Sequence, residues 1–480
     1  MNRTFLKNII FLIFVNLLVK PFYLFGIDRG VQNAVDDGSY GLYFALFNFT
    51  YLFQIINDFG IQNFNNRNIA QYNQLLDKYF PNILVLKGLL AVVYLLVVLV
   101  SAYVGNYSFD IYPFLLLITI NQVLSSLILF FRSNISGLAM YWVDSMISIL
   151  DRLLLIIICG FLLWAPMFQG QFEIWWFVYA QTTTLSITAL IAFIIVRKHI
   201  KRLRFHFHPA FLLLILKKSY PFALVVFLMT LYTRIDGVMI ERMLSDGLLE
   251  ADIYASAFRL LEASNMFAFL FATLLLPMFS KMIKEGESVA PLVRFSFQFI
   301  GAGAVSLTFA VLFFQEEIMV GLYEHGDIYS GQILMYLMIS FLAMAGSTVY
   351  GTLLTANGSL MKMNVIFLIG VFLNVILNGI LIPESKALGA AIASCITQGL
   401  VFFAQLFLAK QELKLRFATD MIIRMLLFMI VSYAMMYWCC GYLDWRWIYR
   451  FVSCLGLGII LAILFKLIDL VQLIELVRTR

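Results

Sequence analysis

The chain contains fourteen successive apolar runs of about 18–25 residues, each long enough to cross a bilayer as a helix. They lie near 8–27, 40–60, 82–104, 111–131, 143–164, 174–196, 219–243, 253–279, 292–314, 330–354, 362–382, 387–409, 421–441 and 449–470. Only 12% of the 480 residues are charged, whereas soluble domains carry about 25%. Because lipid leaves backbone polar groups without water, such runs fold as helices. The sequence therefore predicts an all-α polytopic membrane protein with about 14 transmembrane helices.

Loop charges predict the orientation of these helices. If the N-terminus is cytoplasmic, 22 of the 33 Lys and Arg residues lie on the cytoplasmic side and five on the opposite side. Cytoplasmic loops of membrane proteins are enriched in Lys and Arg. We therefore expect both termini to be cytoplasmic.

The longest polar link, 197–218, separates the first six spans from the next six. We expect it to anchor the chain at the cytoplasmic surface, and clustered Lys and Arg there can also attract anionic lipid head groups. A weak internal repeat supports two halves, since DDGSYGLYFALFNF at 36–49 is echoed by LLEADIYASAFRLL at 248–261. Internal repeats are frequent in transporters. The predicted organisation is an N-terminal six-helix bundle (1–205) and a C-terminal six-helix bundle (206–410) around a central cavity, with two additional helices in 411–480.

Charged side chains within the spans are the candidate functional residues, because a charge in lipid costs several kcal/mol unless it faces a protein interior or a wet cavity. The candidates for contact with a substrate head group in the cavity are Lys20, Arg152, Arg234 and Arg259. The candidates for gating or ion coupling are Asp58, Asp151, Asp236 and Glu262.

Each of these candidates also has a structural alternative. Arg234 with Asp236, and Arg259 with Glu262, can form neutral pairs that hold two helices together, and Asp58 can cap a helix end. The side chains of Lys87 and Lys466 are expected to extend to a membrane interface.

Asn374 and Asn378 share one helix face, where they can bind sugar hydroxyls or form interhelical hydrogen bonds. The cysteines and histidines show no metal-ligand spacing, so no metal site is expected. No nucleotide-binding loop is present either, and no cofactor is expected. Energy would come from a gradient of H⁺ or Na⁺, from the membrane potential or from product removal.

Several sequence blocks resemble the polysaccharide-transporter (O-antigen flippase) family. They are DDGSYGLYFALFNFTYLFQIINDFGIQNFNNRNIAQ at 36–71, YTRIDGVMI at 232–240, IYASAFRLLEAS at 253–264, LLLPMFSK at 274–281, and the stretch 353–398 with its Asn374/Asn378 helix and Ile-Pro turn. The resemblance covers about residues 5–410. The chain departs from the family before the acidic turn, where GIDRGVQNAVDDG replaces the usual LLG pattern.

This resemblance implies a flippase for undecaprenyl-pyrophosphate-linked oligosaccharides in the bacterial inner membrane, working by alternating access. Its partners would be that substrate, membrane lipids, and a polysaccharide polymerase with a chain-length regulator; a monomer is expected, and no nucleic acid. Guanidinium groups suit the substrate because they bind phosphate oxygens bidentately.

Three alternatives remain from the sequence. Two are exporters of the same superfamily, for cationic drugs coupled to an ion gradient or for lipid II. The third is a membrane enzyme, a polysaccharide polymerase or a glycosyltransferase, which generally needs a sizeable domain outside the membrane. No predicted external loop exceeds about 20 residues, so the protein is not expected to be an enzyme.

Overall fold

The structure, a computed structural model, describes residues 19–62, 65, 69, 76–138, 140–168, 170–200, 209–415, 419–442 and 445–468. In this part of the chain the regular structure is helical throughout, and ten helices are long and apolar enough to cross a membrane. The predicted all-α polytopic class is confirmed. The chain divides into two compact units, Met1–Glu241 and Arg242–Arg480.

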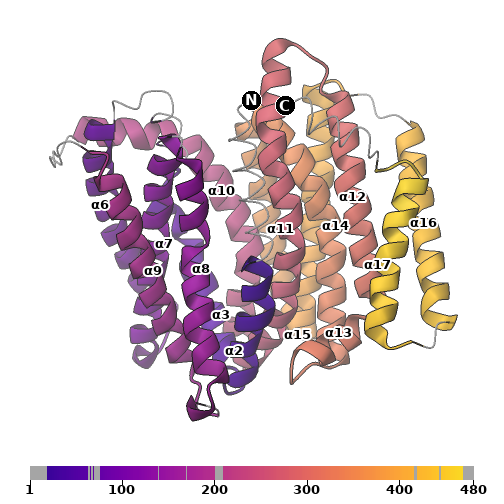
Figure 1. Cartoon of the computed structure of the whole chain (residues 1–480), viewed down its shortest axis with the longest axis horizontal. Helices are drawn as coiled ribbons and strands as arrows, with labels where there is room; N and C mark the ends of the chain where they lie inside the picture. The colour runs from indigo at the N-terminus through magenta and orange to yellow at the C-terminus, as the bar shows by residue number, and fades with distance from the viewer. Residues whose placement is uncertain are drawn as a thin grey trace. The chain divides into compact units, whose positions relative to one another are not determined.

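The first unit is built around one central helix, α7. Its described elements are η1 (Tyr23–Asp28), α2 (Arg29–Ala34), α3 (Ser39–Leu52), α4 (Gln54–Asp58), α6 (Leu76–Val104), η3 (Phe109–Ile111), α7 (Tyr112–Gly137), α8 (Tyr141–Trp164), η4 (Pro166–Phe168), α9 (Ile174–Arg197) and nearly all of α10 (Pro209–Met243). Helix α7 packs against α3, α6, α8 and α9, and α6 to α9 run side by side (Figure 1).

Aromatic rings form the core between α6, α7 and α9. Phe80 stacks on Phe130 and Phe131, with ring centroids 5.4 and 6.0 Å apart, and Phe193 completes the group. Within a bilayer, helices associate through such close packing because lipid tails are as apolar as the side chains.

The second unit is built around α14. Its elements are α11 (Gly247–Glu285), α12 (Ala290–Phe313), α13 (Gln315–Leu322), α14 (Ile328–Ala356), α15 (Leu360–Glu412), α16 (Thr419–Tyr442) and α17 (Trp447–Leu464). Helix α14 packs against α11, α12 and α15, and α16 and α17 pack on α12 (Figure 1). A capping box starts α14: Asp327 Oδ1 accepts from the Ser330 amide, and Ser330 Oγ accepts from the Asp327 amide.

Helix α15 is two helices joined at a break. Lys386 has φ 53° and ψ −132°, three residues after Pro383, which lacks an amide donor. The two halves then pack against each other, since a Cβ at Gly370 would lie 3.0 Å from Val401. At the break itself only glycine fits position 389, where a Cβ would lie 2.2 Å from the Leu381 carbonyl oxygen. The predicted Ile-Pro turn is therefore present as this break.

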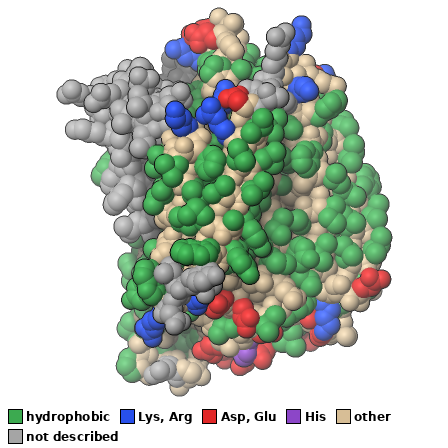
Figure 2. Space-filling model, turned by 90° about the vertical axis from the view of Figure 1, so that its right-hand side faces the viewer, with side chains coloured by type: hydrophobic (Ala, Val, Ile, Leu, Met, Phe, Trp, Pro, Cys, Tyr) green, Lys and Arg blue, Asp and Glu red, His purple; other side chains and the backbone are tan. Residues whose placement is uncertain are grey.

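The surface of the second unit shows how it sits in lipid. On the face in Figure 2, hydrophobic side chains cover the middle, and Lys, Arg, Asp and Glu gather at the two ends. Large apolar side chains of α16 and α17 are exposed, including Ile430, Trp438 and Val452. In water such a surface would drive aggregation, whereas in a bilayer it faces lipid tails.

Of the fourteen predicted spans, 362–382 and 387–409 together form α15, and three others differ in form from the ten candidate helices. The 8–27 span lies partly outside the described residues. The 40–60 span is divided into α3 and α4 at Phe53, and the 253–279 span lies within the 39-residue α11. The predicted division at residues 205 and 410, with its central cavity, stays a prediction.

Candidate functional site

Three of the predicted site residues come together in the first unit. Arg152 on α8 lies 3.6 Å from Asp151 and places its guanidinium carbon 4.4 Å from the centre of the Tyr23 ring. Lys20, just before η1, lies within electrostatic range of Arg152, Arg132 and Asp151. The Arg152 side chain is 40% exposed.

A buried carboxylate that the sequence analysis missed lies beside this cluster. Asp28 is 2% exposed, and its Oδ2 accepts a hydrogen bond of 2.7 Å from the Tyr40 hydroxyl, with Tyr23 at 3.3 Å from Oδ1. It ends the π-helical turn η1, in which the Arg29 amide donates to the Leu24 carbonyl five residues back. π-Turns often mark functional positions. An acidic residue so soon after Lys20 in an apolar run was the signal available in the sequence.

Arg234 contacts α3. Its Nη1 lies 3.4 Å from Asn48 Oδ1, and its guanidinium carbon lies 5.3 Å from the Tyr51 ring centre. Residues two apart on a helix do not face each other, and Asp236 is 1% exposed. The close approach depends on Gly237, where a Cβ would lie 2.7 Å from both Phe44 and Asn48.

Asp58 forms an ion pair with Lys87, so the expectation that Lys87 extends to an interface was wrong. Lys87 Nζ lies 2.5 Å from Asp58 Oδ1, and the Lys87 side chain is 1% exposed. The ammonium also donates to Asn57 O at 3.2 Å and Ser126 Oγ at 2.7 Å. The chain buries this cation because three acceptors surround it.

The remaining predicted site residues lie in the second unit. Arg259 and Glu262 pair at 2.7 Å along α11, and their side chains are 12% and 25% exposed. On α15, Asn378 Nδ2 donates to Asn374 Oδ1 at 3.1 Å, and both residues are fully buried. In this conformation the two asparagines bond each other rather than present their amides to a ligand.

Beside the α15 break, a polar cluster connects α11, α14 and α15. Glu250, 5% exposed, accepts from Tyr329 at 2.8 Å and from the Ala387 amide at 3.3 Å, and Lys386 Nζ lies 3.1 Å away. Lys386 also bonds Asp246 in the loop before α11, which holds the pKa of Asp246 below its ordinary value. These contacts cap the second half of α15 and fix the break.

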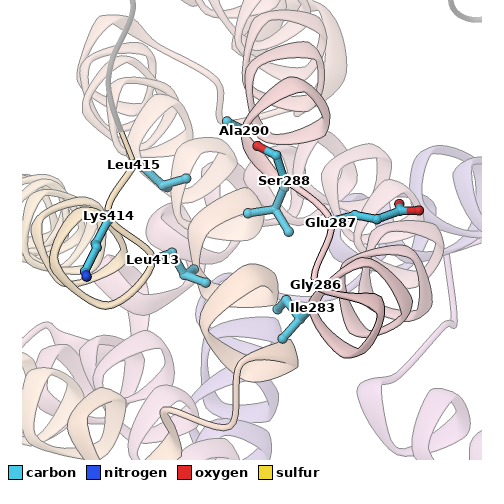
Figure 3. A pocket seen from close by; sticks show the side chains of 9 residues that line it. Ile283, Gly286, Glu287, Ser288, Ala290, Leu413, Lys414 and Leu415 are labelled. Carbon is cyan, nitrogen blue, oxygen red and sulfur yellow. The ribbon is translucent and has the colours of Figure 1, made fainter.

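A cavity of about 450 Å³ lies elsewhere in the second unit, between the α11–α12 loop and the end of α15. It is lined by Ile283, Gly286, Glu287, Ser288, Val289, Ala290, Leu413, Lys414 and Leu415. In Figure 3 the charged ends of Glu287 and Lys414 point away from each other. This cavity contains none of the predicted site residues.

Sequence comparison assigns the chain to a family. Residues 5–283, more than half of the chain, match the family described as polysaccharide biosynthesis protein. The protein belongs to this family. No curated protein matches it in sequence.

Solved structures of transporters and flippases share the fold of this family member. The lipid II flippase MurJ, in an inward closed conformation, has a TM-score of 0.73 at 14% identity, over 96% of this chain and 99% of that one. A mutant of the Vibrio cholerae MATE transporter VcmN has a TM-score of 0.61 at 13% identity, over 86% and 97%. A MOP superfamily transporter from Pyrococcus furiosus has 0.56 at 12% identity, over 85% and 95%. The protein is thus a multi-pass membrane protein of the polysaccharide biosynthesis family with this transporter fold.

Proposed function

We propose that the protein is a flippase that moves undecaprenyl-pyrophosphate-linked oligosaccharide units across the bacterial inner membrane. The units would serve the synthesis of a surface polysaccharide such as an O-antigen, a capsule or an exopolysaccharide. The family match supports a role in polysaccharide synthesis, and the fold shared with a lipid II flippase supports movement of a lipid-linked substrate.

The observation that carries this proposal is the pair of cations in the first unit. Lys20 and Arg152 share this site with two carboxylates, Asp151 and the buried Asp28. Charged groups kept inside a spanning region mark substrate paths. A pyrophosphate has the charge and the oxygen acceptors for both groups, and Arg152 offers the planar fork that binds phosphate oxygens.

The proposed cycle is alternating access with the lipid tail remaining in the membrane. Only the pyrophosphate and sugars then pass through the protein, so the charged residues inside the spans are needed for the head group alone. Both termini would be cytoplasmic, the protein would act as a monomer, and a gradient of H⁺ or Na⁺ would supply energy. A polysaccharide polymerase and a chain-length regulator would receive the product.

The alternative cargoes differ in charge or in sugar. An exporter of cationic drugs would need a net acidic site, whereas Lys20, Arg152 and Arg234 are here as numerous as the carboxylates Asp28, Asp151 and Asp236. Lipid II is also a lipid-linked sugar, so only the experiment below distinguishes it from the proposed substrate.

Deletion of the gene tests the proposal. We expect complete lipid-linked oligosaccharide units to accumulate on the cytoplasmic side of the inner membrane, measured by extraction and by accessibility of the sugars to an added lectin. Complementation with the wild-type protein should abolish the accumulation, whereas complementation with the double variant Lys20→Met/Arg152→Met should not. The double variant Lys20→Arg/Arg152→Lys keeps both charges and should restore part of the flux.

Lys281→Met, which removes a cation whose side chain is 74% exposed, is the matched control and should complement fully. Accumulation of lipid II instead of oligosaccharide units would favour the lipid II exporter. Complete but unpolymerised units on the periplasmic side would overturn the proposal and favour a membrane enzyme.

A further inference from the structure

Three aromatic rings form a ladder along one face of α3. Tyr43, Phe47 and Tyr51 are spaced four residues apart, so they lie above one another on the helix. The ring centroids of Tyr43 and Phe47 are 6.0 Å apart, and those of Phe47 and Tyr51 are 5.7 Å apart and stacked. Eight residues of helix give the ladder a length of about 12 Å.

Polar groups from two other helices border the ladder at its two ends. At one end Gln181 on α9 donates a hydrogen bond of 2.8 Å to the Tyr43 hydroxyl. At the other end the Arg234 guanidinium of α10 lies over the Tyr51 ring, where it is also within 3.4 Å of Asn48. All these contacts lie within the first unit.

Two rings of the ladder, Phe47 and Tyr51, are accessible, whereas Tyr43 is buried. Most residues of α3 are buried, including Tyr40, Phe44 and Phe49, whereas Phe47 and Tyr51 are partly exposed. A lipid-facing surface would not place the Arg234 guanidinium beside the exposed Tyr51 ring, because charged groups in lipid are costly. The exposed faces therefore border a polar space.

We infer that the exposed rings of the ladder, Phe47 and Tyr51, are a binding surface for pyranose rings of the transported oligosaccharide, with Arg234 bonding their hydroxyls. The inference rests on the proposed function and adds the site of sugar contact. The C–H groups of a pyranose carry partial positive charge and pack on the negative face of an aromatic ring. Such contact needs no particular sugar sequence, since every pyranose presents C–H groups.

The inference predicts that sugars and pyrophosphate bind to different residues, so the two contributions to affinity can be measured separately. The full-length protein in lipid nanodiscs is titrated with two probes, undecaprenyl pyrophosphate and an undecaprenyl-pyrophosphate-linked trisaccharide of neutral pyranoses. Equilibrium binding is read by native mass spectrometry. Because each ring contact contributes at most about 1.5 kcal/mol, we expect the wild type to bind the glycosylated probe about tenfold more tightly.

Phe47→Leu/Tyr51→Leu should remove this difference while leaving the affinity for undecaprenyl pyrophosphate unchanged. Phe47→Tyr keeps the ring and should retain the difference, which separates stacking from a change in fold. Phe109→Leu, at an exposed aromatic off the ladder, should behave as wild type. Lys20→Met/Arg152→Met should weaken both probes equally.

Equal binding of the two probes to the wild type, or an unchanged preference in Phe47→Leu/Tyr51→Leu, would overturn the ladder and leave the flippase proposal standing. Failure of the wild type to bind either probe would overturn the flippase proposal and the ladder with it.

Discussion

Lys87 and Asp58 form a buried ion pair in the first unit, with Lys87 Nζ 2.5 Å from Asp58 Oδ1. The pair joins the short α4 to α6, and Ser126 extends the contact to α7. All three N–H groups of the ammonium have acceptors, so the cation is buried without an unsatisfied donor. The pair fixes α4 after the break at Phe53.

Breaking this pair should strongly destabilise the protein. Asp58→Ala leaves the Lys87 cation without its counter-charge, and removal of one partner of a buried pair costs about 3 kcal/mol or more. The double variant Asp58→Ala/Lys87→Met removes both charges and should recover most of the stability that Asp58→Ala loses. Thermal unfolding in detergent measures both effects. An unfolding temperature for Asp58→Ala equal to that of wild type would mean that the pair contributes nothing.

Gly237→Ala should separate α10 from α3. The added methyl group would lie 2.7 Å from Phe44 and Asn48, and overpacking of this kind costs about 1–3 kcal/mol. Gly303→Ala on α12 is the matched control, because nothing lies within 4 Å of its Cβ position. The unfolding temperature should fall for Gly237→Ala only. Equal unfolding temperatures of the two variants would contradict the close approach of α10 to α3.

Tyr40→Phe should destabilise the protein more than Tyr23→Phe. The Tyr40 hydroxyl donates to the buried Asp28 at 2.7 Å, whereas that of Tyr23 is 3.3 Å away. A hydrogen bond to a charged group contributes about 1.5–3 kcal/mol, and the shorter bond is the stronger. Unfolding midpoints of the two variants give the order, and the reverse order would show that Tyr23 is the main donor.

The Asp246–Lys386 contact should affect stability in a pH-dependent way. The hydrogen bond from Lys386 lowers the pKa of Asp246 below its ordinary 3.8, so its contribution is present above pH 3.8. It is lost as the pH falls through the lowered pKa of the folded state. The stability difference between wild type and Asp246→Asn should therefore be constant from about pH 8 to pH 5 and shrink below pH 3.8. If the stability difference between the two proteins changes between pH 8 and pH 5, a titrating group other than Asp246 causes it.

Much of the fold could be predicted from the sequence because a bilayer allows few solutions. Apolar runs of spanning length identify helices without knowledge of their partners. The division of the 40–60 span at Phe53 and the position of the break at Lys386 could not be predicted in this way. They depend on tertiary contacts, such as those that hold Lys386 in its non-helical conformation.

The candidate site was predicted in its residue types but less well in its pairings. Spacing along one helix correctly favours Arg259 with Glu262, because residues three apart share a face. Lys87 with Asp58, and Asp28 with Tyr40, join segments that the sequence does not align. Charge inside a span indicates that a partner exists, and only packing shows which one.

The break at Lys386 has a consequence for biosynthesis. Both halves of α15 are apolar and a single non-helical residue joins them, so no loop exists that could wait outside the membrane while the second half follows. We therefore expect the two halves to insert into the membrane together, as a helical hairpin. A reporter domain inserted between Ser385 and Ala387 would therefore interfere with membrane insertion itself.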